Sequence, residues 1–466
     1  MESEELCTTS LTEVAALLAR GALSPVELTR AVLARIERLD GALHSYLTVT
    51  AEHALAAARA AEAELQRGAR RGPLHGVPVG VKDLCATRGI RTTCASAVCP
   101  DAPPDRDATV VRRLAAAGAV MVGKTNLTEY ALMGYHPTLP RPRNPWNPTR
   151  DTGGSSGGSG AAVAAGLCFA AIGTDTGGSI RMPSGWCGVV GLKPTYGRVS
   201  RAGVFPLGAS LDHVGPMTRR VADAAAALDA MAGFDPDDPT TLRGPAPECA
   251  AAIGGDVRGV RIGWDAGFVA GGTQSDYADT VERAVRQLEA EGARVVEVSL
   301  PPVEALLPAW PVLCAAEALV AHAPTYPARA ADYGPTFRSF LEYATTLSAA
   351  QYAAAHEARM RWAGQLRGVF EQIDVLACPS TFITAPPLEL IDPLSPFNPA
   401  IAPFMRFVAP FNFSGSPTLS LPCGFDGEGL PYSLQLVGRH AEEALLCRVG
   451  HVYEQATEWH RRRPPV

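Results

Sequence analysis

Two glycine-rich segments that contain serine are the part of this sequence best suited to chemistry. Residues 151–160 read DTGGSSGGSG, residues 173–181 read GTDTGGSIR, and the apolar stretch 161–172 joins them. Glycine lets backbone N–H groups come close to a reacting atom, and a serine hydroxyl becomes a nucleophile when a base is beside it. A flexible linker would not contain so apolar a connection. The pattern therefore predicts two rigid turns around a serine-dependent reaction.

Histidine is the usual base for such a serine, but the sequence does not favour it here. The string 153–157 matches the Gly-x-Ser-x-Gly elbow with Ser155 as nucleophile, although no clear strand leads into it. The histidines nearest to the two segments are His75, His136 and His213. None of them stands in a recognisable triad setting, so we expect structural histidines and disfavour a Ser-His-Asp hydrolase.

Lysine is an alternative base if burial keeps it neutral. Lys82 follows the apolar run Val77–Val81 and precedes Asp83. A lysine at the end of a buried strand is rarer than a surface lysine, because burial penalises the charge. Taken alone, the segment fits a buried base or a Lys82–Asp83 pair at the surface.

Five ordered segments together closely resemble the amidase signature family. They are residues 72–83, 153–159, 173–183, 188–194 and 210–217. The resemblance is continuous from about residue 70 to 220, and it resumes more weakly at 378–379 and 410–438. A single glycine–serine turn would be a weak signal, whereas the lysine motif and both turns in the right order are very specific.

The resemblance implies a Ser–cis-Ser–Lys triad for this chain. Ser179 matches the nucleophile, Ser155 matches the bridging serine 24 residues earlier, and Lys82 matches the base. The backbone N–H groups that match the oxyanion hole are those of Thr176, Gly177, Gly178 and Ser179. The family mechanism requires neither a metal nor an organic cofactor, so we expect none.

The polar residues beside the triad allow more than one interpretation. Ser156 either bonds within the triad or stabilises the turn, and Ser159 is expected to be structural. Asp175 and Arg181 flank the nucleophile, and we expect a buried pair that braces the turn rather than a contact with substrate. Asp212 is expected to brace the site in a similar way.

The sequence suggests an apolar substrate. Met133 and Tyr135 lie in a segment, 131–140, that is expected to precede the pocket and suits an apolar or aromatic acyl group, although ordinary core packing explains it equally well. Candidates for the other side are Trp310, Phe404, Phe407 and Phe411. We therefore predict an amidohydrolase of hydrophobic or aryl amides, with carbamates (urethanes) or esters as further substrates.

Two other functions are weighed against this one. The glutaminase-type A subunit of a tRNA-dependent amidotransferase shares the triad, but it usually has Gln where Met182 stands, and the C-terminal half lacks an obvious site for a free amino acid. A non-catalytic binding protein on the same fold is disfavoured because all three triad residues are present.

Composition excludes several classes of protein. The formal net charge is −6 and no basic run exceeds the short segments 461–463 and 219–220, so we expect no nucleic-acid partner. The 11 cysteines include no Cys-x-x-Cys, which disfavours a zinc site or a secreted disulfide framework. The acidic N-terminus is unlike a signal peptide, and the longest apolar stretch, 161–173, is too short to span a bilayer. We expect a cytoplasmic monomer or homodimer that acts on a small-molecule amide or carbamate, away from the membrane.

The elements that must position these residues alternate between strand and helix. Residues 77–81, 119–122 and 167–172 are predicted strands, and a helix is predicted to open at Asn126–Glu129. This alternation predicts an α/β fold with a large mixed, mostly parallel sheet covered by helices on both faces, as the family resemblance also implies. We expect a single domain, 1–466, with a helical segment at 1–70, the signature core at 70–220 and a helical cap within 303–350.

Overall fold

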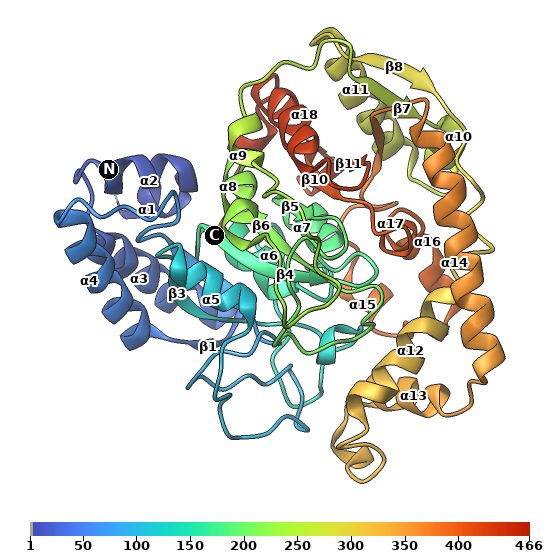
Figure 1. Ribbon diagram of the computed structural model, residues 1–466, viewed down its shortest axis with the longest axis horizontal. Coiled ribbons are helices and arrows are strands. Elements are labelled where there is room, and N and C mark those ends of the chain that lie inside the picture. Colours follow the sequence, from blue (N-terminus) through green and yellow to red (C-terminus); the bar gives the residue numbers. More distant parts are fainter. Residues whose placement is uncertain (1–2) are drawn as a thin grey trace.

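One eleven-stranded sheet organises the computed structural model, which describes residues 3–466 (Figure 1). The strands are β1 (Tyr46–Val49), β2 (Pro78–Lys82), β3 (Val120–Thr125), β4 (Ala170–Asp175), β5 (Val190–Lys193), β6 (His213–Thr218), β7 (Arg261–Trp264), β8 (Arg294–Glu297), β9 (Val375–Pro379), β10 (Thr418–Phe425) and β11 (Pro431–Gly438). Their order across the sheet is β1-β3-β2-β4-β6-β5-β10-β11-β9-β7-β8. The predicted large mixed α/β sheet is confirmed.

Parallel pairing is less common in this sheet than the sequence predicted. The parallel pairs of the described strands are β2–β3, β2–β4, β7–β8 and β7–β9, and the other six pairs are antiparallel. The expectation rested on helices between strands, but a helical connection does not force its two strands to be neighbours. Between β4 and β5, for example, the chain forms a helix, and β6 then inserts antiparallel to both strands.

Eighteen α-helices surround the sheet in the described part of the chain. They are α1 (Ser3–Thr8), α2 (Leu11–Ala19), α3 (Pro25–Leu43), α4 (Ala51–Gln66), α5 (Thr109–Ala116), α6 (Gly157–Ala164), α7 (Arg181–Cys187), α8 (Val221–Met231), α9 (Cys249–Ala252), α10 (Ala266–Ala270), α11 (Ser275–Ala290), α12 (Ala309–His322), α13 (Pro335–Ala344), α14 (Ala349–Phe370), α15 (Leu388–Ile391), α16 (Ala402–Arg406), α17 (Ala409–Phe413) and α18 (Glu443–Gln455). Across residues 3–466, no helix combines the length and apolar character needed to cross a bilayer.

The helix predicted to open at Asn126 does not form. Only a short 3₁₀ turn, Glu129–Ala131, is present there, because Tyr130 and Ala131 have φ values of 47° and 63°. These positive φ values are incompatible with a continuing right-handed helix. The segment instead turns back along the site, where Ala131 reaches a large cavity.

Helices cover both faces of the sheet. A Cβ atom at Gly191 of β5 would lie 2.1 Å from the hydroxyl of Ser184, so this position faces α7. The neighbouring Leu192 points to the other face and is in register with Leu419 of β10, which packs against Gly450 of α18. Helices α7 and α18 therefore lie on opposite faces.

The candidate site forms where β2 and β4 end. These strands are parallel, with Val81 in register with Ile172, so both carboxyl ends reach the same edge of the sheet. Helix α6 begins beside them, and Gly158 allows the close approach because a Cβ there would lie 2.5 Å from the backbone of Asn126. The residues of both strands are buried.

The helical region within 303–350 lies outside the sheet (yellow to orange in Figure 1). Helix α12 contacts α13 and α14. One residue of α12, Trp310, reaches back to the loop that follows β4, where its indole Nε1 lies 3.0 Å from the carbonyl oxygen of Thr176. The region thus contacts the part of the chain that carries the predicted nucleophile.

Candidate active site

Lys82 ends β2 in the centre of the site, and its side chain is completely buried. Its Nζ donates hydrogen bonds to the hydroxyls of Ser155 at 2.7 Å, Ser156 at 2.8 Å and Thr174 at 2.8 Å. Ser156 therefore bonds directly to the predicted base. Thr174 was missed by sequence reasoning, although it lies in the Gly-Thr-Asp motif that leads to Ser179.

The interpretation of Lys82 and Asp83 as a surface pair is wrong. Both side chains are fully buried, and Asp83 pairs with Lys124, whose Nζ lies 3.2 Å from its carboxylate. Because the hydrogen-bond partners of Lys82 are neutral hydroxyls, they do not offset the loss of hydration. Burial therefore lowers the pKa of Lys82 from 10.5 to about 7. A substantial fraction of Lys82 is neutral near neutral pH and available to accept a proton.

The two predicted serines lie in turns that contact each other. Ser155 is fully buried and follows the cis peptide bond Gly154–Ser155, whereas Ser179 is 8% exposed and faces the cavity. The backbone N–H of Ser156 donates to the carbonyl oxygen of Ser179 at 3.3 Å. Within residues 3–466 the Ser179 hydroxyl makes no hydrogen bond, so it is free to meet a ligand, and its link to Ser155 is not formed in this state.

One of the four N–H groups predicted for the oxyanion hole already donates a hydrogen bond within the protein. The backbone N–H of Gly178 donates to Oδ1 of Asp175 at 2.8 Å, so its assignment as a free donor is corrected. The N–H groups of Thr176, Gly177 and Ser179 have no acceptor among the described residues. Gly177 and Ser179 also line the cavity, which makes their amides the best-placed donors.

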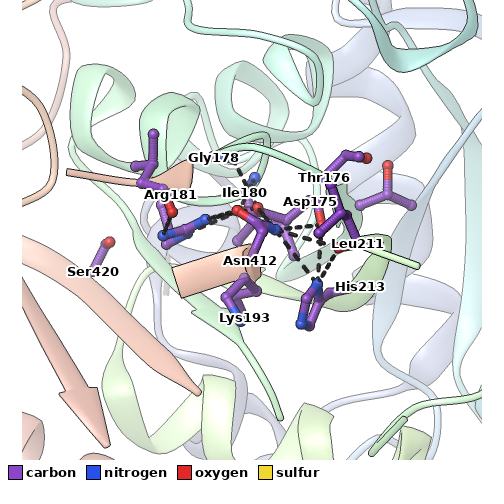
Figure 2. Close-up of polar contacts among 12 residues, drawn as sticks. Asp175, Thr176, Gly178, Ile180, Arg181, Lys193, Leu211, His213, Asn412 and Ser420 are labelled. Carbon is purple, nitrogen blue, oxygen red and sulfur yellow. Dashed lines mark hydrogen bonds and ion pairs between the residues drawn. The ribbon is translucent and has the colours of Figure 1, made fainter. Parts of the chain in front are cut away.

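Asp175 holds the turn that carries Ser179 together (Figure 2). Its carboxylate accepts hydrogen bonds from the N–H groups of Gly178 at 2.8 Å and Ile180 at 3.0 Å. Arg181 binds both carboxylate oxygens, at 2.9 and 3.0 Å, and Asn412 donates to one of them at 2.8 Å. The expected bracing role of Asp175 and Arg181 fits this geometry, and both side chains are fully buried.

The surroundings of Asp175 stabilise the ionised form of its carboxyl group. Burial by itself raises the pKa of the carboxyl group, but Arg181, Lys193 and the hydrogen bond from Asn412 outweigh it and hold the pKa well below its usual range. Asn412 was missed by sequence reasoning, and its only signal was the weak resemblance over 410–438. Tertiary packing brings it to the cluster from a distance of 237 residues.

Asp175→Asn is therefore expected to destabilise the protein. Removing one member of a buried ion pair leaves an uncompensated charge, and the free energy of unfolding should fall by about 3–5 kcal/mol. Urea unfolding followed by tryptophan fluorescence measures this loss. The exposed pair Asp256–Arg258 provides a matched control, because Asp256→Asn should leave stability unchanged. Equal stability of Asp175→Asn and wild type would contradict the bracing role.

Asp212 and Ser159 also support the site through hydrogen bonds, without lining the cavity. A carboxylate oxygen of Asp212 accepts from the Thr176 hydroxyl at 2.6 Å, and its carboxylate accepts from the N–H groups of Leu207 and Gly208. The Ser159 hydroxyl bonds to that of Thr125 at 2.7 Å. Neither residue lines the cavity, in agreement with structural roles.

The cavity in front of Ser179 has a volume of about 820 Å³. Met133 and Tyr135 line it, as do Trp310 and Phe404. Phe407 and Phe411, by contrast, are fully buried and do not reach it, so they were wrongly placed. Further apolar lining comes from residues that carried no sequence signal: Leu307, Tyr343, Ile401 and Met405.

The histidines near the core motifs have structural partners. Nε2 of His75 lies 3.1 Å from Glu64, Nδ1 of His136 bonds to Thr138, and Nδ1 of His213 lies 2.6 Å from a backbone carbonyl oxygen. No described histidine bonds to Ser155 or Ser179. The arrangement fits a serine hydrolase whose base is lysine.

Comparison with known proteins places the chain in a family. The Amidase family model matches residues 27–447. The chain is 46% identical over 466 residues to AmiD of Mycobacterium tuberculosis, a protein named as a candidate amidase, with 100% of this chain and 98% of the relative covered. It is 42% identical over 485 residues to the A subunit of the glutamyl-tRNA(Gln) amidotransferase of Moorella thermoacetica, covering 97% and 98%.

A solved structure gives the same result for the fold. A bacterial aryl acylamidase of the amidase signature family superposes with a TM-score of 0.87 at 27% identity, covering 97% of this chain and 98% of that one. The chain belongs to the amidase family and is an amidase signature hydrolase.

Proposed function

We propose that this protein hydrolyses hydrophobic or aryl amides through an acyl-enzyme on Ser179. The observation that carries the proposal is the buried Lys82, with a pKa lowered to about 7, bonded to Ser155 between the two serine turns. A lysine poised near neutrality is suited to accept a proton. The exposure of Ser179 to the cavity supplies a nucleophile beside it.

The first half of the proposed reaction forms the acyl-enzyme. Oγ of Ser179 attacks the amide carbon while its proton passes to Ser155 and the Ser155 proton passes to neutral Lys82. The carbonyl π electrons move to oxygen, where the N–H groups of Gly177 and Ser179 stabilise the negative charge. The oxygen then re-forms the carbonyl, the C–N bond breaks, and the proton returns through Ser155 to the leaving nitrogen.

The second half restores the free enzyme. Water attacks the ester carbon of acylated Ser179 and gives up a proton along the same relay. The ester C–O bond breaks, the proton returns to Ser179, and a carboxylic acid leaves. Every step uses side chains and amides of this chain, so the proposal involves no metal or organic cofactor.

The cavity lining supports the substrate class. Its walls include Met133, Leu307, Trp310 and Phe404, which suit an apolar or aromatic group. A carbamate or an ester places a carbonyl in the same position relative to Ser179, so both are included as further substrates. The aryl acylamidase that shares the fold is a relative whose name agrees with this class.

Glutamine hydrolysis in a tRNA-dependent amidotransferase is the second candidate, favoured by the similarity to the Moorella thermoacetica protein. A free amino acid would need a charged partner in the cavity. Arg141 lines the cavity, but its guanidinium is bound to Asp151 and Asp392 and is not free to bind a substrate carboxylate. We therefore favour the apolar amides.

A substrate panel tests the proposal: an anilide, a short aliphatic amide, a phenyl carbamate, a urea and glutamine. Burying a phenyl ring contributes about 1.5–3 kcal/mol, so kcat/KM for the anilide should exceed that for the aliphatic amide by roughly tenfold to hundredfold. Glutamine should not be turned over. Ser179→Ala serves as the background control, and faster turnover of glutamine than of every aryl substrate would overturn the proposed class.

A further inference from the structure

The Thr176–Gly177 peptide carries the N–H of Gly177, a residue that lines the cavity, and its carbonyl is held from outside the signature core. The carbonyl oxygen of Thr176 accepts a hydrogen bond of 3.0 Å from the indole N–H of Trp310. Trp310 lies in the first turn of α12, which belongs to the helical region beyond the sheet. The rest of this loop is held by Asp175 and Asp212, which belong to the core.

Holding the carbonyl also determines the direction of the next N–H group. A peptide unit is planar and trans, so the C=O of Thr176 and the N–H of Gly177 point in opposite directions. A hydrogen bond that fixes the carbonyl therefore fixes the amide across the same plane. The Gly177 N–H has no acceptor in residues 3–466, so it is available to a ligand.

The packing around Gly177 makes this contact close and specific. A Cβ atom at Gly177 would lie 2.7 Å from Nε1 of Trp310 and 2.7 Å from Cε of Met405. The indole also lines the cavity together with Gly177 and Ser179. Any side chain at position 177 would collide with the indole, so glycine is what lets the loop and Trp310 approach this closely.

We propose that Trp310 is a positioning residue for the oxyanion hole: its indole N–H orients the Thr176–Gly177 peptide so that the Gly177 amide faces the reacting carbonyl. Trp310 does this through the peptide and not by touching the reacting atoms. The helical region at 303–350 thereby contributes to catalysis and not only to the wall of the cavity. This inference rests on the proposed acyl-enzyme chemistry.

Trp310→Phe removes the N–H group and keeps an aromatic ring. Loss of one oxyanion donor typically lowers kcat by about 10²–10³-fold, so a misoriented donor should lower kcat by about tenfold or more. The best substrate of the panel is used. The dissociation constant of that substrate, measured in a Ser179→Ala background, should change clearly less than kcat, because an aromatic ring remains in the cavity wall and the ground state gains little from the oxyanion hole.

An aryl trifluoromethyl ketone provides a second readout that a purely structural role would not move. Oγ of Ser179 adds to the ketone carbon, its proton passes through Ser155 to Lys82, and the C=O π electrons move to the oxygen, which becomes a fully charged alkoxide. The inhibition constant of the ketone should therefore rise in Trp310→Phe in parallel with the fall in kcat. Trp146→Phe is the matched control, because the Trp146 indole donates to a backbone carbonyl at 2.8 Å outside the cavity.

The outcomes separate the inference from the proposed function. If the wild type neither turns over the panel nor forms the ketone adduct, the proposed function and the inference both fail. If the wild type does both but Trp310→Phe keeps the wild-type kcat and inhibition constant, the positioning role alone is overturned. The positioning role is also overturned if the Trp310→Phe substitution lowers substrate affinity in the Ser179→Ala background as much as it lowers kcat. Should Trp310→Phe not fold, 3-benzothienylalanine at position 310 removes the N–H with the ring shape kept.

Discussion

Ser179→Ala is expected to abolish nearly all amide hydrolysis, lowering kcat by on the order of 10⁴–10⁶-fold. The Ser179 hydroxyl faces the cavity and makes no hydrogen bond within residues 3–466, so its removal takes away the proposed nucleophile without breaking a contact of the fold. The melting temperature should therefore stay close to that of the wild type. Turnover of the best panel substrate and labelling by a fluorophosphonate probe measure the effect.

Ser159→Ala is the matched control for that experiment. Ser159 belongs to the same glycine–serine segment as Ser155, but its hydroxyl bonds to Thr125 and to a backbone carbonyl away from the cavity. Losing such a buried hydrogen bond costs about 1 kcal/mol of stability and should leave kcat within about threefold. Full labelling and turnover by Ser179→Ala would show that another residue is the nucleophile.

Lys82→Met is expected to lower kcat/KM by about 10⁴-fold, since the relay loses its base. As the proposed base, Lys82 can accept a proton only when it is neutral, and its pKa is lowered to about 7. The rate should therefore be high above pH 7 and fall as the pH decreases, by about tenfold between pH 8 and pH 6. The pH profile of kcat/KM in the free enzyme measures this directly.

The same variant tests whether the pH dependence belongs to Lys82. In Lys82→Met the small remaining rate should lose the inflection near pH 7, because no other group of the relay titrates there. Lys124→Met is the matched control, because Lys124 is also a buried lysine. It pairs with Asp83 and does not bond to the hydroxyls that surround Lys82. An unchanged inflection in Lys82→Met would assign the base to another group.

Burial of Lys82 also has a consequence for stability. Its pKa in the folded protein lies below the value of 10.5, so between about pH 7 and 10.5 the unfolded chain binds more protons than the folded one. Stability from this group therefore increases as the pH rises through that window. Lys82→Met removes the contribution of Lys82 to the pH dependence of stability. The difference between the variant and the wild type therefore separates this contribution from those of the other titrating groups.

The local pattern placed the three predicted strands, 77–81, 119–122 and 167–172, within three residues of the bounds of β2, β3 and β4. Ser10 and Ser24, each followed three residues later by Glu, form the capping boxes that start α2 and α3. The prediction failed where the backbone departs from local preference, as in the turn at Tyr130 and Ala131. It also overestimated parallel pairing, because strand order depends on contacts between distant segments.

For the site, the sequence by itself determined which groups are the candidates for the chemistry: Lys82, Ser155 and Ser179 lie in three ordered motifs whose residue types already restrict their roles. Only the tertiary structure decided the burial, the pKa and the hydrogen-bond partners of those groups. It removed Lys82 from water, committed the amide of Gly178 to Asp175, and brought Asn412 and Trp310 to the loop from distant segments. The physical reason is that burial, charge balance and hydrogen-bond direction depend on neighbours in space, which spacing along the chain does not specify.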